Sequence, residues 1–233
     1  MHGNKLLAAF SILGCALTAS AAGVDEPVRR IDVYVTPYYS AGQPPTVRVG
    51  AGVDALLASD SKKDIFAARD AVQKQAATVT PMTMMALAIR LYDVGERDEG
   101  LFWFYAAKDR FLTLARVVDV QAPALREATA AVGAFASLAG PYFNSYAFCD
   151  RKRQHQARLR AVQWVQDHPY EAMKFPALTP LPGDMQQNLA AAIKEIRAGI
   201  EKEKNMVNDP EEWDKLQKMR KQNHVDEQFC WKD

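Results

Sequence analysis

The chain has 233 residues, of which 48% are hydrophobic and 24% charged, the ordinary proportions of a soluble globular protein. It carries 29 lysines and arginines against 28 aspartates and glutamates, a formal net charge of +1. This balance supplies no overall basic field and argues against nucleic acid as a partner. The length is sufficient for one domain with a substantial hydrophobic core.

The first 22 residues have the three-part layout of a secretory signal peptide. Lys5 supplies the positive charge, an apolar run follows over residues 6–13, and residues 15–22 are mostly small. The apolar stretch is shorter than the about 20 residues needed to span a bilayer. We therefore expect a cleaved leader over residues 1–22 and a single mature domain, residues 23–233, in the periplasm or at the outer membrane.

Two cleavage sites compete within this leader. Residues 12–15, Ile-Leu-Gly-Cys, resemble the lipobox of bacterial lipoproteins. Cleavage there would remove residues 1–14 and leave a lipid on Cys15 that anchors the protein to the membrane. Residues 19–21, Ala-Ser-Ala, instead fit ordinary signal peptidase. Either cleavage places the domain outside the cytoplasm.

The first elements predicted in the mature chain are two short strands. Residues 30–36 alternate apolar and polar side chains, which is the pattern of a half-buried strand. Residues 46–49 predict a second strand, and the Pro/Gly-rich segment 37–45 between them favours a turn. The sequence thus predicts a short β-hairpin, which needs a helical layer to rest on.

All later elements are predicted to be helical. Capping residues, prolines and apolar spacing predict helices over residues 62–75, 81–94, 97–118, 123–138, 150–167, 184–207 and 210–222. Gly140-Pro141 is expected to end the fourth helix and to leave an aromatic-rich loop over residues 140–150. The last two helices, within residues 184–223, are highly charged and have a narrow apolar seam. The predicted fold is a mainly α, multi-helix bundle.

Residues 84–110 resemble a tetratricopeptide-like helical hairpin, in which small residues allow close helix packing and a glycine permits the turn. No second copy follows at a period of about 34 to 40 residues, so a solenoid is not predicted. Residues 102–105 are four consecutive aromatics. They cannot all face one side of a helix, so at least one is expected to be exposed or covered by another element.

Two segments together resemble a family of exported helical proteins of Gram-negative bacteria. They are residues 101–107, Leu-Phe-Trp-Phe-Tyr-Ala-Ala, and residues 140–150, Gly-Pro-Tyr-Phe-Asn-Ser-Tyr-Ala-Phe-Cys-Asp. The family forms are close to FWFYxGQLR and GPxINEYAFGD. Residues 107–109 (Ala-Lys-Asp for Gly-Gln-Leu) and Cys149 (for glycine) depart from them. Members of the family are mostly uncharacterised, and some resemble immunity proteins that protect a cell against antibacterial effectors.

Cys149 and Cys230 are the two cysteines that remain once Cys15 is assigned to the leader or to a lipid. An even pair in an oxidising compartment favours a disulfide. Two separate thiols, with Cys149 buried, are the alternative.

The candidate binding residues come from the hairpin and the expected loop. They are Asp98, Glu99, Trp103, Asn144 and Tyr146. Each has a plainer interpretation. Asp98 and Glu99 would lie in a solvated turn, Trp103 would pack in the core, and Asn144 and Tyr146 would lie in a loop folded into the core. No motif indicates a catalytic, cofactor or metal site, because the chain has no HExxH, GxSxG or CxxC.

These observations predict an exported binding protein without catalysis, whose partner is a protein. The resemblance implies an immunity protein that neutralises a secretion-system effector. A scaffolding lipoprotein of the envelope is the alternative, and an envelope hydrolase with dispersed catalytic residues is a third hypothesis. Any membrane contact is expected through the lipid on Cys15.

Overall fold

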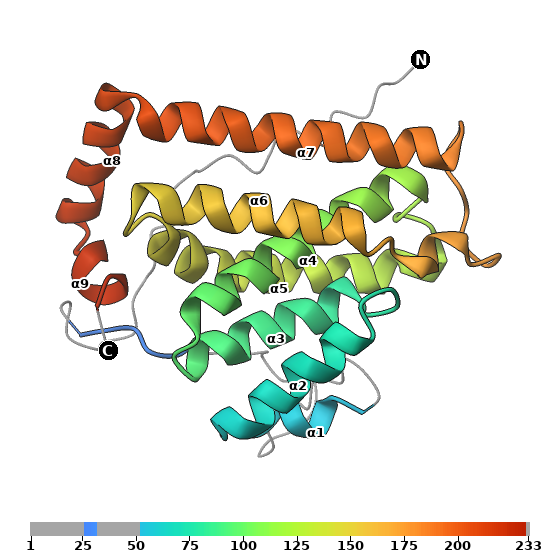
Figure 1. Cartoon of the computed structure of the whole chain (residues 1–233), viewed down its shortest axis with the longest axis horizontal. Helices are drawn as coiled ribbons and strands as arrows, with labels where there is room; N and C mark the ends of the chain where they lie inside the picture. The colour runs from blue at the N-terminus through green and yellow to red at the C-terminus, as the bar shows by residue number, and fades with distance from the viewer. Residues whose placement is uncertain (1–25, 32–51, 232–233) are drawn as a thin grey trace.

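The computed structural model describes residues 26–31 and 52–231 (Figure 1). Over these residues the chain is a mainly helical, multi-helix bundle, as predicted. The only β pairing in these two ranges is an isolated bridge between Val118 and Pro180. The predicted leader, with Cys15, lies outside the described residues. So does the predicted β-hairpin, except for residues 30–31, which are not in a strand.

The helices are numbered in chain order. They are α1 (Asp54–Leu57), α2 (Lys62–Lys74), α3 (Pro81–Asp93), α4 (Arg97–Val117), α5 (Pro123–Ala147), α6 (Arg151–Asp167), the short 3₁₀ helix η1 (Glu171–Lys174), α7 (Met185–Asn208), α8 (Pro210–Gln222) and α9 (Val225–Phe229). Six predicted helices correspond to α2, α3, α4, α6, α7 and α8 to within about one residue at each end. The capping signals explain this agreement. The side chains of Thr80, Asp150 and Asp184 each accept a backbone N–H in the first turn of the helix that follows.

Helix α5 is longer than predicted. It continues through Gly140-Pro141 to Ala147, so the predicted end at Leu138 and the predicted loop over residues 140–150 are wrong. Proline inside a helix costs about 3 kcal/mol. Phe143, fully buried, alone contributes about 1.5–3 kcal/mol, and other buried residues of the same segment add to it. Burial therefore outweighs the local stop signal.

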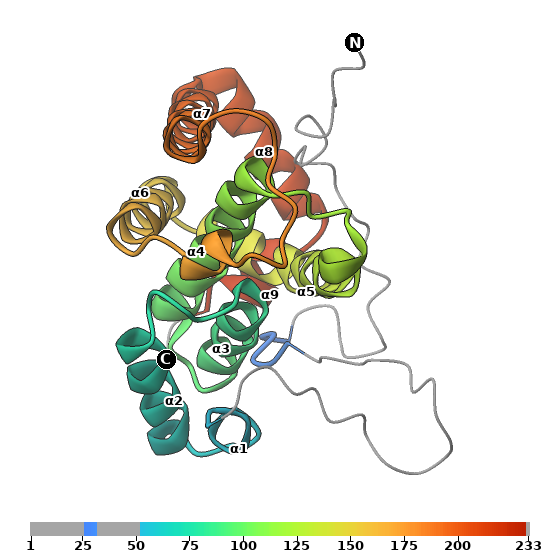
Figure 2. The same cartoon turned by 90° about the vertical axis from the view of Figure 1, so that its right-hand side faces the viewer.

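Helix α4 lies at the centre of the bundle and packs against α3, α5, α6 and α7 (Figures 1 and 2). Because successive residues of a helix point about 100° apart, four consecutive side chains face four directions. Each direction is occupied by a neighbouring helix. All four aromatics of residues 102–105 are consequently buried, with at most 3% of their surface exposed.

Helices α3 and α4 form a closely packed hairpin. Gly95 adopts a φ of 88° at the turn, a conformation that glycine takes without steric cost. At Gly100, a Cβ atom would lie 2.8 Å from the carbonyl oxygen of Ala88. The two helices can approach this closely only because residue 100 has no side chain.

A disulfide joins Cys149 and Cys230, which are 81 residues apart in the sequence. It attaches the end of α9 to the end of α5. The predicted pairing of these cysteines is therefore confirmed in the structure. Within the part of the chain that the structure covers, no helix has the length and apolarity to cross a membrane.

Candidate functional site

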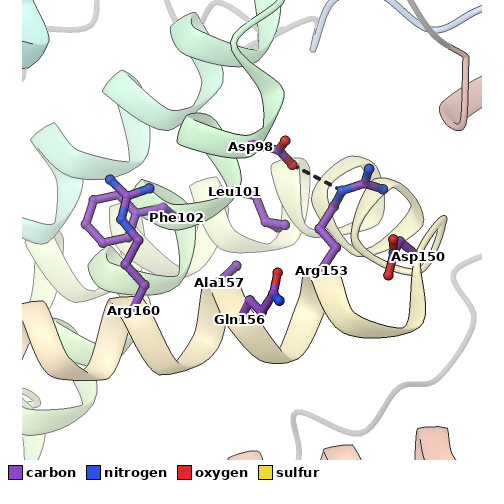
Figure 3. A pocket seen from close by; sticks show the side chains of 8 residues that line it. All are labelled: Asp98, Leu101, Phe102, Asp150, Arg153, Gln156, Ala157 and Arg160. Atoms are coloured by element: carbon purple, nitrogen blue, oxygen red, sulfur yellow. Dashed lines mark ion pairs between the residues drawn. The ribbon is translucent and has the colours of Figure 1, made fainter.

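A groove of about 400 Å³ lies between the N-terminal half of α4 and the part of α6 that faces it, over residues 150–160 (Figure 3). We call it the α4–α6 groove. Its lining residues are Asp98, Leu101, Phe102, Asp150, Arg153, Gln156, Ala157 and Arg160. Both walls are rigid helices, so the groove is a preformed surface rather than a loop.

Two acid–base pairs follow one another along the groove. Arg153 Nε lies 3.1 Å from Asp98 Oδ1, and Arg160 Nη1 lies 2.9 Å from Glu99 Oε2. The two arginines are seven residues apart, about two helical turns, and therefore share one face of α6. The Arg160 guanidinium also lies 3.8 Å from the centre of the Phe102 ring, a cation–π contact.

Tyr146 supports the Asp98 end of the groove. Its hydroxyl donates a hydrogen bond of 2.8 Å to Asp98 Oδ1, and its carbonyl oxygen accepts one of 3.3 Å from Arg153. Burial, together with the hydrogen bond to Asp98, raises the pKa of Tyr146 to about 12. The phenol therefore remains protonated, and can donate to Asp98, throughout the neutral range.

The charged groups of the groove are accessible to a partner. The side chains of Asp98 and Arg160 are 73% and 55% exposed, whereas that of Arg153 is 28% exposed. Ion pairs at such exposed positions contribute only about 0–1 kcal/mol. A partner can therefore replace these internal pairs with intermolecular ones at little cost. This exchange suits a protein surface better than it suits an enclosed small-molecule site.

Three of the predicted binding residues come together at this groove. Asp98 lines it, and Glu99 pairs with its Arg160. Tyr146 is buried, with 6% of its surface exposed, so it reaches the groove only through its hydrogen bond to Asp98 and is not itself a partner-contacting residue. Asn144 is exposed but does not line the groove, and its side-chain oxygen accepts a hydrogen bond of 3.2 Å from the Tyr105 hydroxyl.

Trp103 does not belong to the surface. Its side chain is 1% exposed, and its ring lies 5.2 Å, centre to centre, from that of Trp164 in an edge-to-face arrangement. The prediction that Trp103 forms part of a partner-binding face is corrected by this burial. The reason is that α6 covers this side of α4.

The basic residues of the groove were not among the predicted site residues. Arg153 and Arg160 lie in an arginine-rich helix, where single charges usually face solvent. The seven-residue spacing of the two arginines was a signal for a common face. Their acidic partners, however, lie more than fifty residues earlier in the chain, and no local pattern indicates that pairing.

The two sequence motifs meet in the core. The Phe104 and Phe143 rings stack with their centres 4.7 Å apart, next to the Tyr105–Asn144 hydrogen bond. These contacts join α4 to the second half of α5. The main role of the aromatic motifs is therefore to pack α4 against α5.

A polar cluster lies beneath the surface where α4, α6 and α7 meet. Arg158 donates a 2.7 Å hydrogen bond to Asp109 Oδ1, and its Nε lies 3.3 Å from Glu203. Burial, opposed by the Arg158 guanidinium, raises the pKa of Asp109. Burial alone would lower the pKa of Arg158, but the carboxylates of Asp109 and Glu203 raise it. Asp109 Oδ2 is buried without a hydrogen-bond partner.

The chain is similar to an uncharacterised protein of Haemophilus influenzae. The two are 35% identical over 217 residues, which cover 92% of this chain and 84% of the Haemophilus protein. The chain belongs to the same family as this Haemophilus protein. No family model and no solved structure matches the present chain.

Over residues 26–31 and 52–231, no three or more His, Cys, Asp or Glu side chains gather in a way that could hold a metal ion.

Proposed function

We propose that the mature chain is an exported, non-enzymatic binding protein that neutralises an antibacterial effector, and that the α4–α6 groove contacts this effector. The exported location is supported by the Cys149–Cys230 disulfide, in a chain whose first residues have the pattern of a leader. Structural disulfides persist in oxidising compartments and are rare in the cytosol. The disulfide and the leader thus support the same location by independent routes.

The groove supports a protein as the partner. It offers two acid–base pairs, each with one exposed member (Asp98 and Arg160), on helices held by the packed core. Charged groups at the edge of an interface set the orientation and specificity of protein association. We expect the effector to place a basic group against Asp98 and an acidic group against Arg160.

The immunity role is inferred from the resemblance of the two motifs to a family with immunity-like members. The lipid on Cys15 is a further part of the proposal. An acylated Cys15 would hold the protein at the outer membrane, where effectors arrive, whereas cleavage after Ala21 would release it into the periplasm.

We also infer that the α3–α4 hairpin is of the tetratricopeptide-like kind. The close approach at Gly100 and the glycine turn at Gly95 support this inference. The β-hairpin over residues 30–49 stays a prediction from the alternating sequence pattern.

Loss of the gene, followed by complementation, tests the proposed function. A strain that lacks the gene should become sensitive to the effector encoded beside it, and the wild-type gene should restore protection. Arg160→Glu should fail to restore it, because the substitution places two acidic groups, Glu99 and the new carboxylate, side by side. Arg126→Glu, the same charge change at an exposed position on α5 outside the groove, should restore it fully.

Two results would count against this function. A deletion strain that is no more sensitive than its parent would remove the immunity role. Equal protection by the Arg160→Glu and wild-type proteins would show that the effector does not use the groove. Both variants should accumulate to wild-type levels, as measured by immunoblotting, so that protection reports binding rather than folding.

A further inference from the structure

The C-terminal tail is fixed to the first turn of α4. Arg97, which is buried, donates hydrogen bonds of 3.0 Å to the carbonyl oxygen of Phe229 and 2.6 Å to that of Trp231. Its guanidinium also lies 3.6 Å from the centre of the Trp231 ring. Because Arg97 precedes Asp98, the tail is tied to the α4 wall of the groove.

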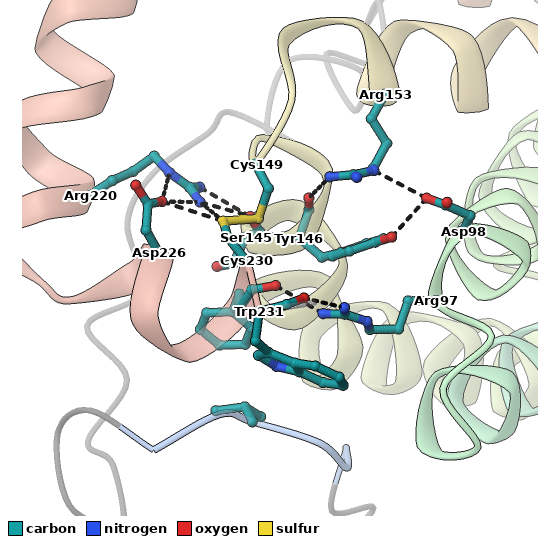
Figure 4. Close-up of a disulfide and its surroundings, with 12 residues drawn as sticks. Arg97, Asp98, Ser145, Tyr146, Cys149, Arg153, Arg220, Asp226, Cys230 and Trp231 are labelled. Atoms are coloured by element: carbon teal, nitrogen blue, oxygen red, sulfur yellow. Dashed lines mark hydrogen bonds and ion pairs between the residues drawn. A yellow bond between two sulfur atoms is a disulfide. The ribbon is translucent and has the colours of Figure 1, made fainter. Parts of the chain in front are cut away.

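The same tail is tied to the α6 wall. Cys230 lies between the two residues whose carbonyl oxygens Arg97 holds, and it is bonded to Cys149 (Figure 4). Cys149 immediately precedes Asp150, which caps α6 by accepting a 2.7 Å hydrogen bond from the Lys152 N–H. One path of covalent and hydrogen bonds therefore joins the N-terminus of α4 to the N-terminus of α6.

Arg220 holds the disulfide in place from the side of α8. It is buried and donates hydrogen bonds of 3.1 Å to the Ser145 carbonyl oxygen and 2.8 Å to Asp226. Its Nη2 lies 3.1 Å from Cys230 Sγ. Ser145 is in the last turn of α5, so α5, α8 and α9 converge on the sulfur atoms.

We propose that the disulfide and residues 229–231 form a clamp that fixes the Asp98 end of the α4–α6 groove, so that the binding shape of the groove depends on the oxidised protein. This inference rests on the proposed function of the groove. The clamp is built from Arg97, Cys149, Cys230 and the tail residues beside Cys230. It makes the oxidation state of the compartment a condition for binding the partner.

The remaining links across this end of the groove are weaker than the clamp. The Asp98–Arg153 pair is partly solvent-exposed, because the Asp98 side chain is 73% exposed, and pairs at such positions contribute little. Tyr146 adds one hydrogen bond to the same carboxylate. The disulfide is the one covalent cross-link within the described ranges. Without the disulfide, this end of the groove is held by these polar contacts, by the Arg153 hydrogen bond to the Tyr146 carbonyl oxygen, and by side-chain packing between α4 and α6.

Reduction by dithiothreitol provides the test. The reagent's two thiols break the S–S bond through a mixed disulfide, leave a thiol on Cys149 and one on Cys230, and become the cyclic disulfide of the reagent. Backbone hydrogen exchange is then measured by mass spectrometry on the full chain, expressed with its own leader, before and after reduction. The Cys149→Ser/Cys230→Ser protein is measured in parallel without the reagent, and circular dichroism confirms its helical content.

We expect roughly tenfold or faster exchange over residues 97–101 and 150–157 in both the reduced and the double-serine protein, with α2 and α3 unchanged. Faster exchange confined to residues 225–231 would overturn the clamp, because the groove would then be independent of the disulfide. Uniformly faster exchange throughout the chain would overturn it as well, because the disulfide would then act on global stability alone.

Arg97→Met separates the clamp from a general effect of the disulfide. This variant keeps the disulfide but removes the donors that link the tail to α4. The oxidised variant should already exchange quickly over residues 97–101, and reduction should add little there. No step of this experiment needs the effector, so the clamp and the proposed immunity function can fail separately.

Discussion

Asp109 and Arg158 show how a charged pair is accommodated inside this bundle. Asp109 is completely buried, and only one of its two carboxylate oxygens has a hydrogen-bond donor. Removing one member of a buried ion pair leaves an uncompensated charge, which costs about 3–5 kcal/mol. The two residues lie 49 positions apart, so their pairing joins α4 to α6.

Arg158→Met should therefore destabilise the protein by about 3–5 kcal/mol at pH 7, because it removes the guanidinium that donates a hydrogen bond to the buried Asp109 carboxylate. Glu203 also loses its contact with Arg158 but is partly exposed and keeps its hydrogen bond from Gln154. Urea unfolding followed by circular dichroism measures the loss. Arg160→Met, on the exposed face of the same helix, should cost less than about 1 kcal/mol.

The cost of Arg158→Met should also depend on pH. Burial raises the pKa of Asp109 in the folded state above its ordinary value of 3.8. The folded protein then binds a proton in a pH range where the unfolded chain does not. The stability contributed by this group is complete below about pH 3.8 and is lost as the pH rises through the raised pKa.

Removing Arg158 raises the pKa of Asp109 further, because the opposing guanidinium is gone. The difference in unfolding free energy between wild type and Arg158→Met should therefore be smaller at pH 4.5 than at pH 7. An equal difference at the two pH values would mean that Asp109 is not the group left uncompensated.

At the scale of elements, the α3–α4 hairpin depends on one glycine. A Cβ at Gly100 would meet the Ala88 carbonyl oxygen at 2.8 Å and the Tyr92 nitrogen at 3.2 Å, and both are backbone atoms that cannot move aside alone. Gly100→Ala should therefore force the two helices apart and destabilise the protein by about 1–3 kcal/mol in thermal or urea unfolding.

Gly133→Ala is the matched control for this substitution. Gly133 also lies inside a helix, but a Cβ at this position would have no neighbouring atom within 4 Å outside its own stretch of helix. The alanine should stabilise α5 by about 0.5–1 kcal/mol, because it reduces the entropy of the unfolded chain. A Gly100→Ala protein as stable as Gly133→Ala would contradict the close approach of the helices.

Most helices could be predicted because their ends carry local signals. Thr80-Pro81 and Asp150, for example, cap helices in the structure as they do in the sequence pattern. The errors arose where packing overrides a local signal. Pro141 predicts a stop, yet the burial of Phe143 continues α5 through it.

The candidate site could be predicted only in part for the same reason. Asp98 and Glu99 are visible as an acidic turn, and they do line or adjoin the groove. The pairing of these acids with Arg153 and Arg160 depends on how α6 lies across α4, which no local pattern encodes. The run of four aromatics predicts that at least one is exposed or covered by another element, and the central position of α4 decides for the second by burying all four.

At the scale of the whole molecule, the disulfide joins the middle of the chain to its end. Closing a loop of 81 residues stabilises a folded protein by up to about 4.5 kcal/mol in the chain-entropy model. That is a large share of the about 5–15 kcal/mol by which a domain is stable. A protein built in this way is suited to a compartment in which the disulfide forms and persists.

A single mass-spectrometric experiment tests whether the protein is both exported and oxidised. The native protein is purified from the producing bacterium without reducing agents, and its intact mass and its disulfide-linked peptides are determined by mass spectrometry. We predict a chain without its leader, beginning either at a lipid-bearing Cys15 or at Ala22, with the peptides of Cys149 and Cys230 joined. An unprocessed chain that begins at Met1 and carries Cys149 and Cys230 as free thiols would show that the protein is neither exported nor oxidised.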